Sequence, residues 1–84
     1  MKSLILTRHA RARAQSRGIP VEWIENTVNN PDWIEPDHND LAIERRYRAI
    51  GQFGGRILRV ACIETNDHFR VISVMFDRNA RRRS

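Results

Sequence analysis

The sequence of 84 residues holds one cysteine, one lysine and no long apolar run. Cys62 has no partner for an internal disulfide, which excludes a disulfide-stapled fold. No segment approaches the roughly 18–20 apolar residues that a membrane span needs. The three large apolar residues 4–6 are too few for a secretory signal. We therefore expect a cytoplasmic protein that makes no contact with a membrane.

Motifs for metal ions and nucleotides are also missing. No pair among His9, His38, His68 and Cys62 has the spacing of a zinc site. The glycines of residues 51–55 fall in a predicted turn with no helix after them, so they do not form a phosphate-binding loop. We expect neither a metal nor a cofactor, which leaves metal-free acid–base chemistry or no chemistry at all.

What the sequence does have is arginine, which supplies 14 of its 15 basic residues and a net charge of +5. The planar guanidinium group matches two phosphate oxygens, although a GC-rich genome also raises arginine use. The signs are segregated: residues 1–18 and 45–63 each carry five bases and no acid, whereas residues 19–44 carry seven acids and no base. Such a chain has a basic side that suits a polyanion, or an acidic protein that mimics one.

Two helices are predicted in the first third of the chain. Thr7 is placed to cap a helix that runs to about Arg17, and Gly18 supplies a left-handed stop. Pro20 suits the first residue of a second helix, which the Asn-Asn-Pro segment at 29–31 ends.

The rest of the chain predicts strands joined by turns. The strands are expected at residues 32–37 (a short edge strand), 43–50, 56–64 and 69–77, the last being nearly all apolar and therefore central. We expect one α+β domain over residues 1–84, with two N-terminal helices packed on a three- to four-stranded antiparallel sheet and a frayed basic tail at 79–84.

The first helix contains the most interesting candidates. His9, Arg13 and Ser16 form a stripe along the edge of its buried seam, and a stripe in that position can line a cleft. Positive neighbours disfavour a further charge on the ring, so we expect His9 to be able to take a proton. A histidine that caps a carbonyl or packs on the sheet is the alternative.

The strand at 43–50 offers a second group. Glu44, Arg46 and Arg48 share one of its faces, and Tyr47 lies on the other. The two arginines could grip adjacent phosphates, or could simply solvate an exposed face.

Arg59 interrupts the apolar run ILRVACI, so it needs a partner or a cleft. A salt bridge to Glu44 or Asp77 is the structural alternative. The pairing of the last two strands stays open, because one register sets Arg59 opposite Ser73 and a shift of one residue sets it opposite Val74.

The segment TRHARARAQSRGIPVEWI resembles the opening of the domain of unknown function 4258 family, whose first helix begins near a histidine and ends in Arg-Gly-Ile. His9 and Arg17 match that pattern by position, and the segments GRILRVACIET and RVISVMFD look like the family's closing strands. The family is similar to the BrnT and RelE toxins of bacterial toxin–antitoxin pairs. The resemblance therefore implies helices on an antiparallel sheet, and a ribonuclease that works without a metal.

Such a reaction needs a base for the ribose 2′-hydroxyl, an acid for the leaving oxygen, and cations beside the phosphorane. From charge and strand alternation we assign the catalytic roles to His9, Arg59 and Tyr47. The base is His9 or Glu44, the acid is Tyr47 or His9, and Arg59 is among the cations. The RNA-binding candidates are Arg13, Arg17, Arg46, Arg48 and Arg78.

The first hypothesis is a toxin-like protein that binds or cleaves RNA, free or in the ribosome, and is neutralised by an antitoxin protein. The alternative is a non-catalytic module whose acidic middle, residues 22–44, and exposed strand edge bind a protein partner. The oligomeric state stays open, a homodimer included.

Overall fold

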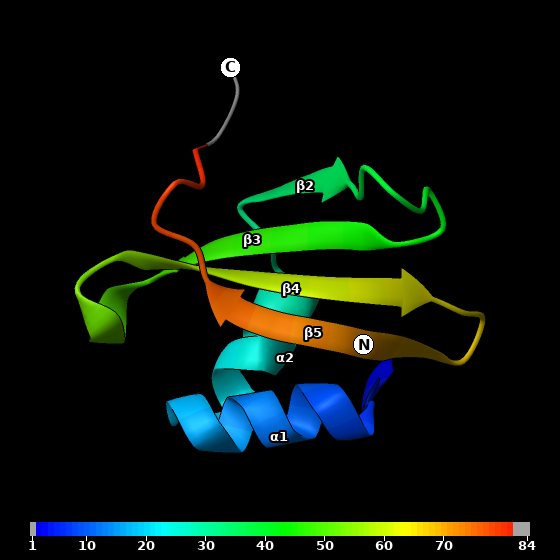
Figure 1. Ribbon diagram of the computed structural model, residues 1–84, viewed down its shortest axis with the longest axis horizontal. Coiled ribbons are helices and arrows are strands. Elements are labelled where there is room, and N and C mark those ends of the chain that lie inside the picture. The colour runs from blue at the N-terminus through cyan, green and yellow to red at the C-terminus, as the bar shows by residue number, and fades with distance from the viewer. Residues whose placement is uncertain (1, 82–84) are drawn as a thin grey trace.

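The computed structural model describes residues 2–81 (Figure 1). The described chain is α+β, as predicted, with two helices and a five-stranded sheet. In chain order the elements are β1 (Ser3–Leu6), α1 (Arg8–Arg17), α2 (Val21–Asn29), β2 (Trp33–Pro36), β3 (Glu44–Ile50), the short 3-10 turn η1 (Gly51–Phe53), β4 (Arg56–Glu64) and β5 (His68–Phe76).

The sheet has the strand order β1-β5-β4-β3-β2 and is mixed, which corrects the prediction of three or four antiparallel strands. β2 to β5 pair antiparallel, but β1 pairs parallel with β5, Ser3 lying opposite His68 and Leu6 opposite Val71. Four residues are too few to show a strand period. The parallel pairing also joins the first and last strands of the chain, with both helices and three strands between them, which no local pattern reveals.

The limits of α1 follow its sequence, and both predicted signals are confirmed. The Thr7 hydroxyl accepts a hydrogen bond from the backbone N–H of Ala10 at 3.2 Å. Gly18 ends the helix at φ 63°, and its N–H donates a hydrogen bond to the carbonyl of Gln15. The second helix begins at Val21, so Pro20 is its N-cap and not its first residue.

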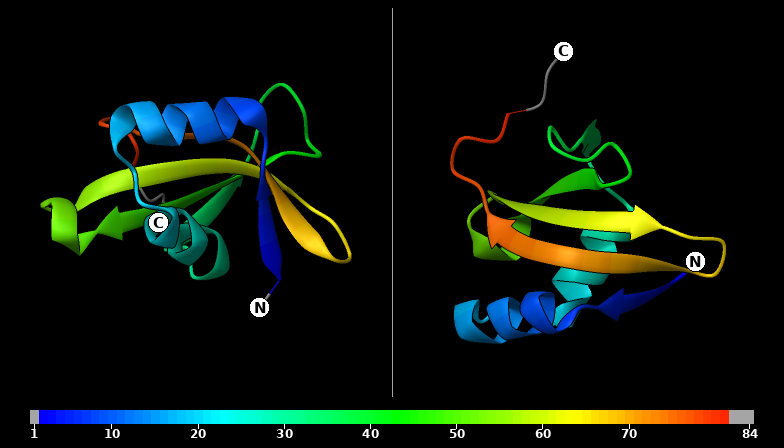
Figure 2. Two further views of the ribbon diagram at one scale, coloured as in Figure 1. Left: turned by 90° about the horizontal axis from the view of Figure 1, so that it is seen from below. Right: turned by 45° about the vertical axis from the view of Figure 1, so that its right-hand side comes forward.

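The core lies between the helices and one face of the sheet. α2 packs on β3 and β4, while α1 runs beside β5 at the sheet's edge (Figures 1 and 2). Ala10 and Ala14 allow α1 to approach closely, and Leu58, Val60 and Cys62 of β4 are fully buried on this face. We call the opposite face the open face, because neither α1 nor α2 covers it (Figure 1).

A β-bulge sets the pairing of β4 with β5. Cys62 lies opposite Val71, but its neighbour Ala61 lies opposite Ser73, so Ile72 is the extra residue. Arg59 consequently pairs with Met75, which corrects both predicted registers. β5 is an interior strand between β1 and β4, and β4 itself is the central strand.

The chain turns sharply after β5. The N–H of Asn79 donates to the Asp77 carboxylate at 2.9 Å, and the N–H of Ala80 donates to the Asp77 carbonyl at 3.3 Å. The frayed tail was predicted for residues 79–84. Asn79 and Ala80 belong to this turn, and residues 82–84 lie outside the described part.

We expect Gly18→Ala to lower the free energy of unfolding by about 1 kcal/mol, because an L side chain is strained in the left-handed region. An added Cβ meets no atom within 4 Å at Gly18 or Gly51, so a clash contributes nothing at either position. Gly51→Ala is therefore the matched control, at a glycine without positive φ, and should change little. Urea unfolding compares the two; equal effects would contradict the strain at Gly18.

Candidate functional site

A groove runs between α1 and the neighbouring edge of β5, with a volume of about 260 Å³. His9, Arg13 and Arg17 line its helix wall, and the strand wall consists of Ser73, Val74 and Met75. We call it the α1–β5 groove. Ser16 lines an adjoining hollow beside the same three helix side chains. The predicted stripe on the first helix therefore does line a cleft.

Local sequence and sheet topology together create this groove. β1 pairs with β5 only as far as Val71, so the rest of that strand edge is left for α1. The buried alanines Ala10 and Ala14 hold α1 against the core. Residues spaced by four lie on one helix face, which sets His9, Arg13 and Arg17 in a row along the strand.

The α1–β5 groove is lined by basic side chains and by no acidic one. His9 and Arg17 are exposed and Arg13 is half-buried. Among the described side chains, no carboxylate lines the groove and none forms an ion pair with Arg13 or Arg17. A groove with basic side chains in a row suits a polyanion more than a neutral ligand.

Arg59 lies on the open face, where its guanidinium is engaged. One nitrogen is 3.2 Å from the Asp77 carboxylate, and the other donates to the Met75 sulfur at 2.6 Å. The predicted structural salt bridge to Asp77 is therefore present. Met75 also lines the α1–β5 groove, so Arg59 lies behind the strand wall rather than within the groove.

Tyr47 faces the same side as Arg59 but is only 3% exposed. The ring of Trp33 stacks on it at 4.6 Å with the planes 4° apart. Arg45 approaches its phenol and pairs with Asp37 at 3.0 Å. Burial alone would lower the pKa of Arg45, but the contacts with Tyr47 and Asp37 outweigh it and raise the pKa. Tyr47 and Arg59 both line a hollow of about 260 Å³, separate from the α1–β5 groove, and these contacts hold Tyr47 in place with little of its side chain exposed.

The strand arginines of β3 serve the fold. Arg46 is buried against the helices: it donates to the Val28 carbonyl at 2.7 Å, pairs with Glu44 at 2.8 Å and lies 4.6 Å over the Phe69 ring. Arg48 donates to the Asn30 carbonyl at 2.6 Å. Strand alternation points both side chains toward the helix layer, so the RNA-binding residues that we propose below do not include Arg46 and Arg48.

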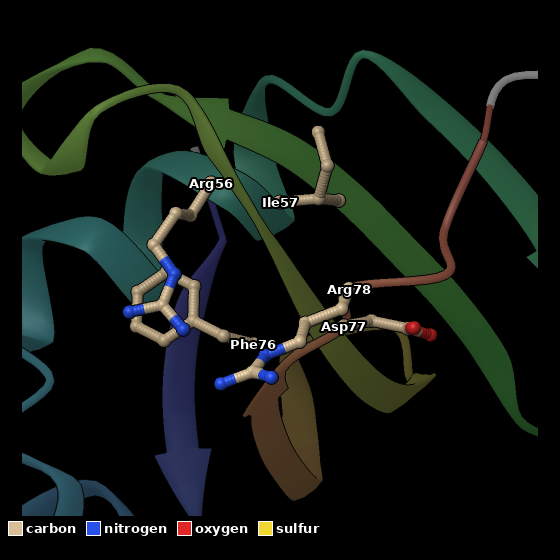
Figure 3. Close-up of a pocket in the computed structure, with 5 residues that line it drawn as sticks. All are labelled: Arg56, Ile57, Phe76, Asp77 and Arg78. Carbon is tan, nitrogen blue, oxygen red and sulfur yellow. The ribbon is translucent and has the colours of Figure 1, made fainter.

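A second hollow lies where β5 ends, beside the start of β4 (Figure 3). It is lined by Arg56, Ile57, Phe76, Asp77 and Arg78. Arg78 was a predicted RNA-binding residue, and it is exposed here. Sequence reasoning missed Arg56, because only the pairing of β4 with β5 brings it beside Arg78. The local sequence pointed to Arg56 only through its position directly after the two glycines at 54–55, at the end of a turn.

A reactive thiol, a metal site and a membrane-spanning helix are all absent from residues 2–81. Burial raises the pKa of the Cys62 thiol to about 11, so this thiol is no nucleophile at neutral pH. Within residues 2–81, no group of three or more His, Cys, Asp or Glu side chains could hold a metal ion. In the same part of the chain, no helix has the length and hydropathy needed to cross a membrane.

A family model for a domain of unknown function (DUF4258) matches residues 6–76. The chain belongs to this family. No curated protein and no solved structure matches it. The DUF4258 match takes in both walls of the α1–β5 groove, and Arg56 and Phe76 of the second hollow as well. Arg78 lies just beyond the matched segment.

A pH test addresses the contacts that hold Arg45 and Tyr47. The N–H of Asn39 and, less strongly, Arg45 lower the pKa of the Asp37 carboxyl below its ordinary 3.8. Ionised Asp37 therefore stabilises the fold above that value, and the stabilisation is lost as the pH falls through the lowered pKa. We expect Asp37→Asn to destabilise the protein at about pH 6 and progressively less toward about pH 3.

Urea unfolding of both proteins across this pH range measures the effect. Asp67→Asn is the control, at an exposed loop residue outside the ion pairs described above, and should differ little from the parent at any pH. A destabilisation by Asp37→Asn that does not change with pH would contradict the assignment.

Proposed function

We propose that this protein is a toxin-like RNA-binding protein that holds RNA in the α1–β5 groove and is neutralised by an antitoxin. The observation that carries the proposal is the row of His9, Arg13 and Arg17, spaced by four residues and free of carboxylates in the lining. Four residues of helix rise about 6 Å, so a chain laid along α1 meets a side chain at every turn. Neutralising phosphates with arginine gives binding that weakens steeply with salt.

The resemblance to BrnT and RelE toxins supports a metal-independent ribonuclease at the same groove. Of the three catalytic candidates, His9 alone is exposed. His9 takes the proton of the ribose 2′-hydroxyl, and the freed oxygen attacks the adjacent phosphorus. The bond from phosphorus to the 5′-oxygen then breaks, and that oxygen takes a proton from water or from the imidazolium. A 2′,3′-cyclic phosphate and a 5′-hydroxyl result, with Arg13 beside the phosphorane.

The alternative, a non-catalytic module for a protein partner, has a different surface. β2 is an edge strand of the sheet, and its Ile34 is 45% exposed. However, β2 is short and ends at Pro36, two features that limit pairing with another chain. The basic α1–β5 groove favours RNA as the ligand.

Removing the groove arginines should weaken RNA binding. We expect Arg13→Ala with Arg17→Ala to lower the affinity about tenfold, and the slope of log K against log salt by about 1.4 for a single strand. Arg8→Ala with Arg11→Ala removes the same charge from the exposed side of α1, and should cost less than about threefold. Fluorescence anisotropy of labelled RNA at several salt concentrations measures the affinity of both variants. Equal losses of affinity would contradict binding of RNA in the groove.

Replacing His9 tests the cleavage step. The wild-type protein should cleave total or ribosomal RNA equally with and without EDTA. His9→Ala should reduce the rate at least about 100-fold and bind RNA within about threefold. His38→Ala, in an exposed loop, is the control, and Tyr47→Phe should stay active. If the wild-type protein cleaves no RNA and its induction leaves growth normal, the ribonuclease proposal is refuted. The RNA-binding proposal is then decided by the anisotropy measurements alone.

A further inference from the structure

The hollow at the end of β5, which we call the β5-end hollow, has a volume of about 230 Å³. That is below the roughly 300–1,000 Å³ of pockets for drug-sized ligands, but it has room for a phosphate group. Figure 3 shows the guanidinium groups of Arg56 and Arg78 on the same side of it, near Phe76. Two cations thus lie together around one small cavity.

The nearby carboxylate does not neutralise them. Asp77 is 3.2 Å from Arg59 through one oxygen, and the other oxygen accepts the N–H of Asn79 at 2.9 Å. In Figure 3 its side chain points away from Arg56 and Arg78. Within residues 2–81, neither of these two arginines forms an ion pair. The β5-end hollow therefore offers two guanidinium groups to an anion.

The guanidinium group of Arg56 also borders an aromatic cluster. The rings of Phe53 and Phe76 are 5.0 Å apart, and Trp23 lies 5.9 Å from Phe53 and 6.4 Å from Phe76. Arg56 lies over both phenylalanines, at 4.8 Å and 5.3 Å from their centroids. Phe53 is 40% exposed, so part of an aromatic side chain beside Arg56 is open to solvent at the border of the hollow.

The β5-end hollow lies next along the chain from the strand wall of the α1–β5 groove. Residues 73–75 form the strand wall of the groove, and residues 76–78 line the hollow, so one stretch of chain joins them. α1 and β5 run in the same direction in both Figures 1 and 2. Arg17 therefore lies at the end of the groove nearest the hollow.

We propose that the β5-end hollow is a second subsite for RNA and takes an unpaired nucleotide. Arg56 and Arg78 bind its phosphate, and the exposed ring of Phe53 stacks on its base. A base inside a duplex already stacks on its neighbours and is not offered to a side chain, whereas a single strand can supply one. The inference rests on the proposed RNA binding and narrows its substrate to single-stranded RNA.

The test compares one RNA of about ten nucleotides with the same RNA annealed to its complement, both labelled for anisotropy. We expect the single strand to bind about tenfold more tightly than the duplex. Trp33→Phe leaves Trp23 as the sole tryptophan, and its emission should be quenched by the single strand alone. Anisotropy with the unaltered protein gives the same comparison if that variant does not fold.

Two variants separate phosphate binding from base stacking. Arg78→Ala should weaken single-strand binding about fivefold and lower the salt slope by about 0.7. Phe53→Leu keeps an apolar side chain, and should remove the preference for the single strand while leaving duplex affinity unchanged. Arg70→Ala removes the same charge as Arg78→Ala from an exposed position at the other end of β5, and should bind like the parent. Arg56 is left intact because it covers the aromatic cluster.

The outcomes distinguish this inference from the proposal beneath it. If Arg78→Ala and Phe53→Leu bind like the parent while the groove variants are weak, the β5-end hollow is no subsite and the proposed function stands. If the duplex binds as tightly as the single strand, the inference is overturned even where Arg78 matters. If the parent binds no RNA at all, the proposed function and the inference fall together.

Discussion

The pairing of β4 with β5 decides where the cations of this chain point. The bulge at Ile72 shifts the register by one residue beyond Cys62, so Arg59 meets Met75 on the open face. In the same pairing, Val60 and Val74 lie opposite each other within the core. Without the extra residue the open-face positions of β5 would turn toward the helices, and the strand wall of the α1–β5 groove would be lost.

The arginines divide into those that the fold engages and those that it leaves available. Arg45, Arg46 and Arg59 are hydrogen-bonded to carboxylates, and Arg46 is buried as well. An ion pair of this kind costs the solvation of both charges and serves mainly to fix geometry. By contrast, hollows without such partners in the described chain are lined by Arg13 and Arg17 of α1 and by Arg56 and Arg78 at the end of β5. The position of an arginine in the fold, and not the net charge of the protein, therefore separates structural arginines from candidate ligand contacts.

In the function that we propose, the α1–β5 groove and the β5-end hollow contribute two different modes of recognition. The groove offers charge at regular spacing, which suits a sugar–phosphate backbone but carries no information about the bases. The hollow adds aromatic rings under a guanidinium group, which suits an unpaired base. Most of their lining residues lie within the segment that matches the DUF4258 family model.

The sequence by itself determined the local features: the cap at Thr7, the stop at Gly18, the limits of β4 and the stripe that contains His9. Each follows from neighbours in the chain, through backbone hydrogen bonds or side-chain periodicity. Only the tertiary structure decided the fifth strand, the partner of Arg59 and the meeting of Arg56 with Arg78. These depend on pairings between distant segments, and a single bulge residue, which no local pattern marks, changes the face that a side chain occupies.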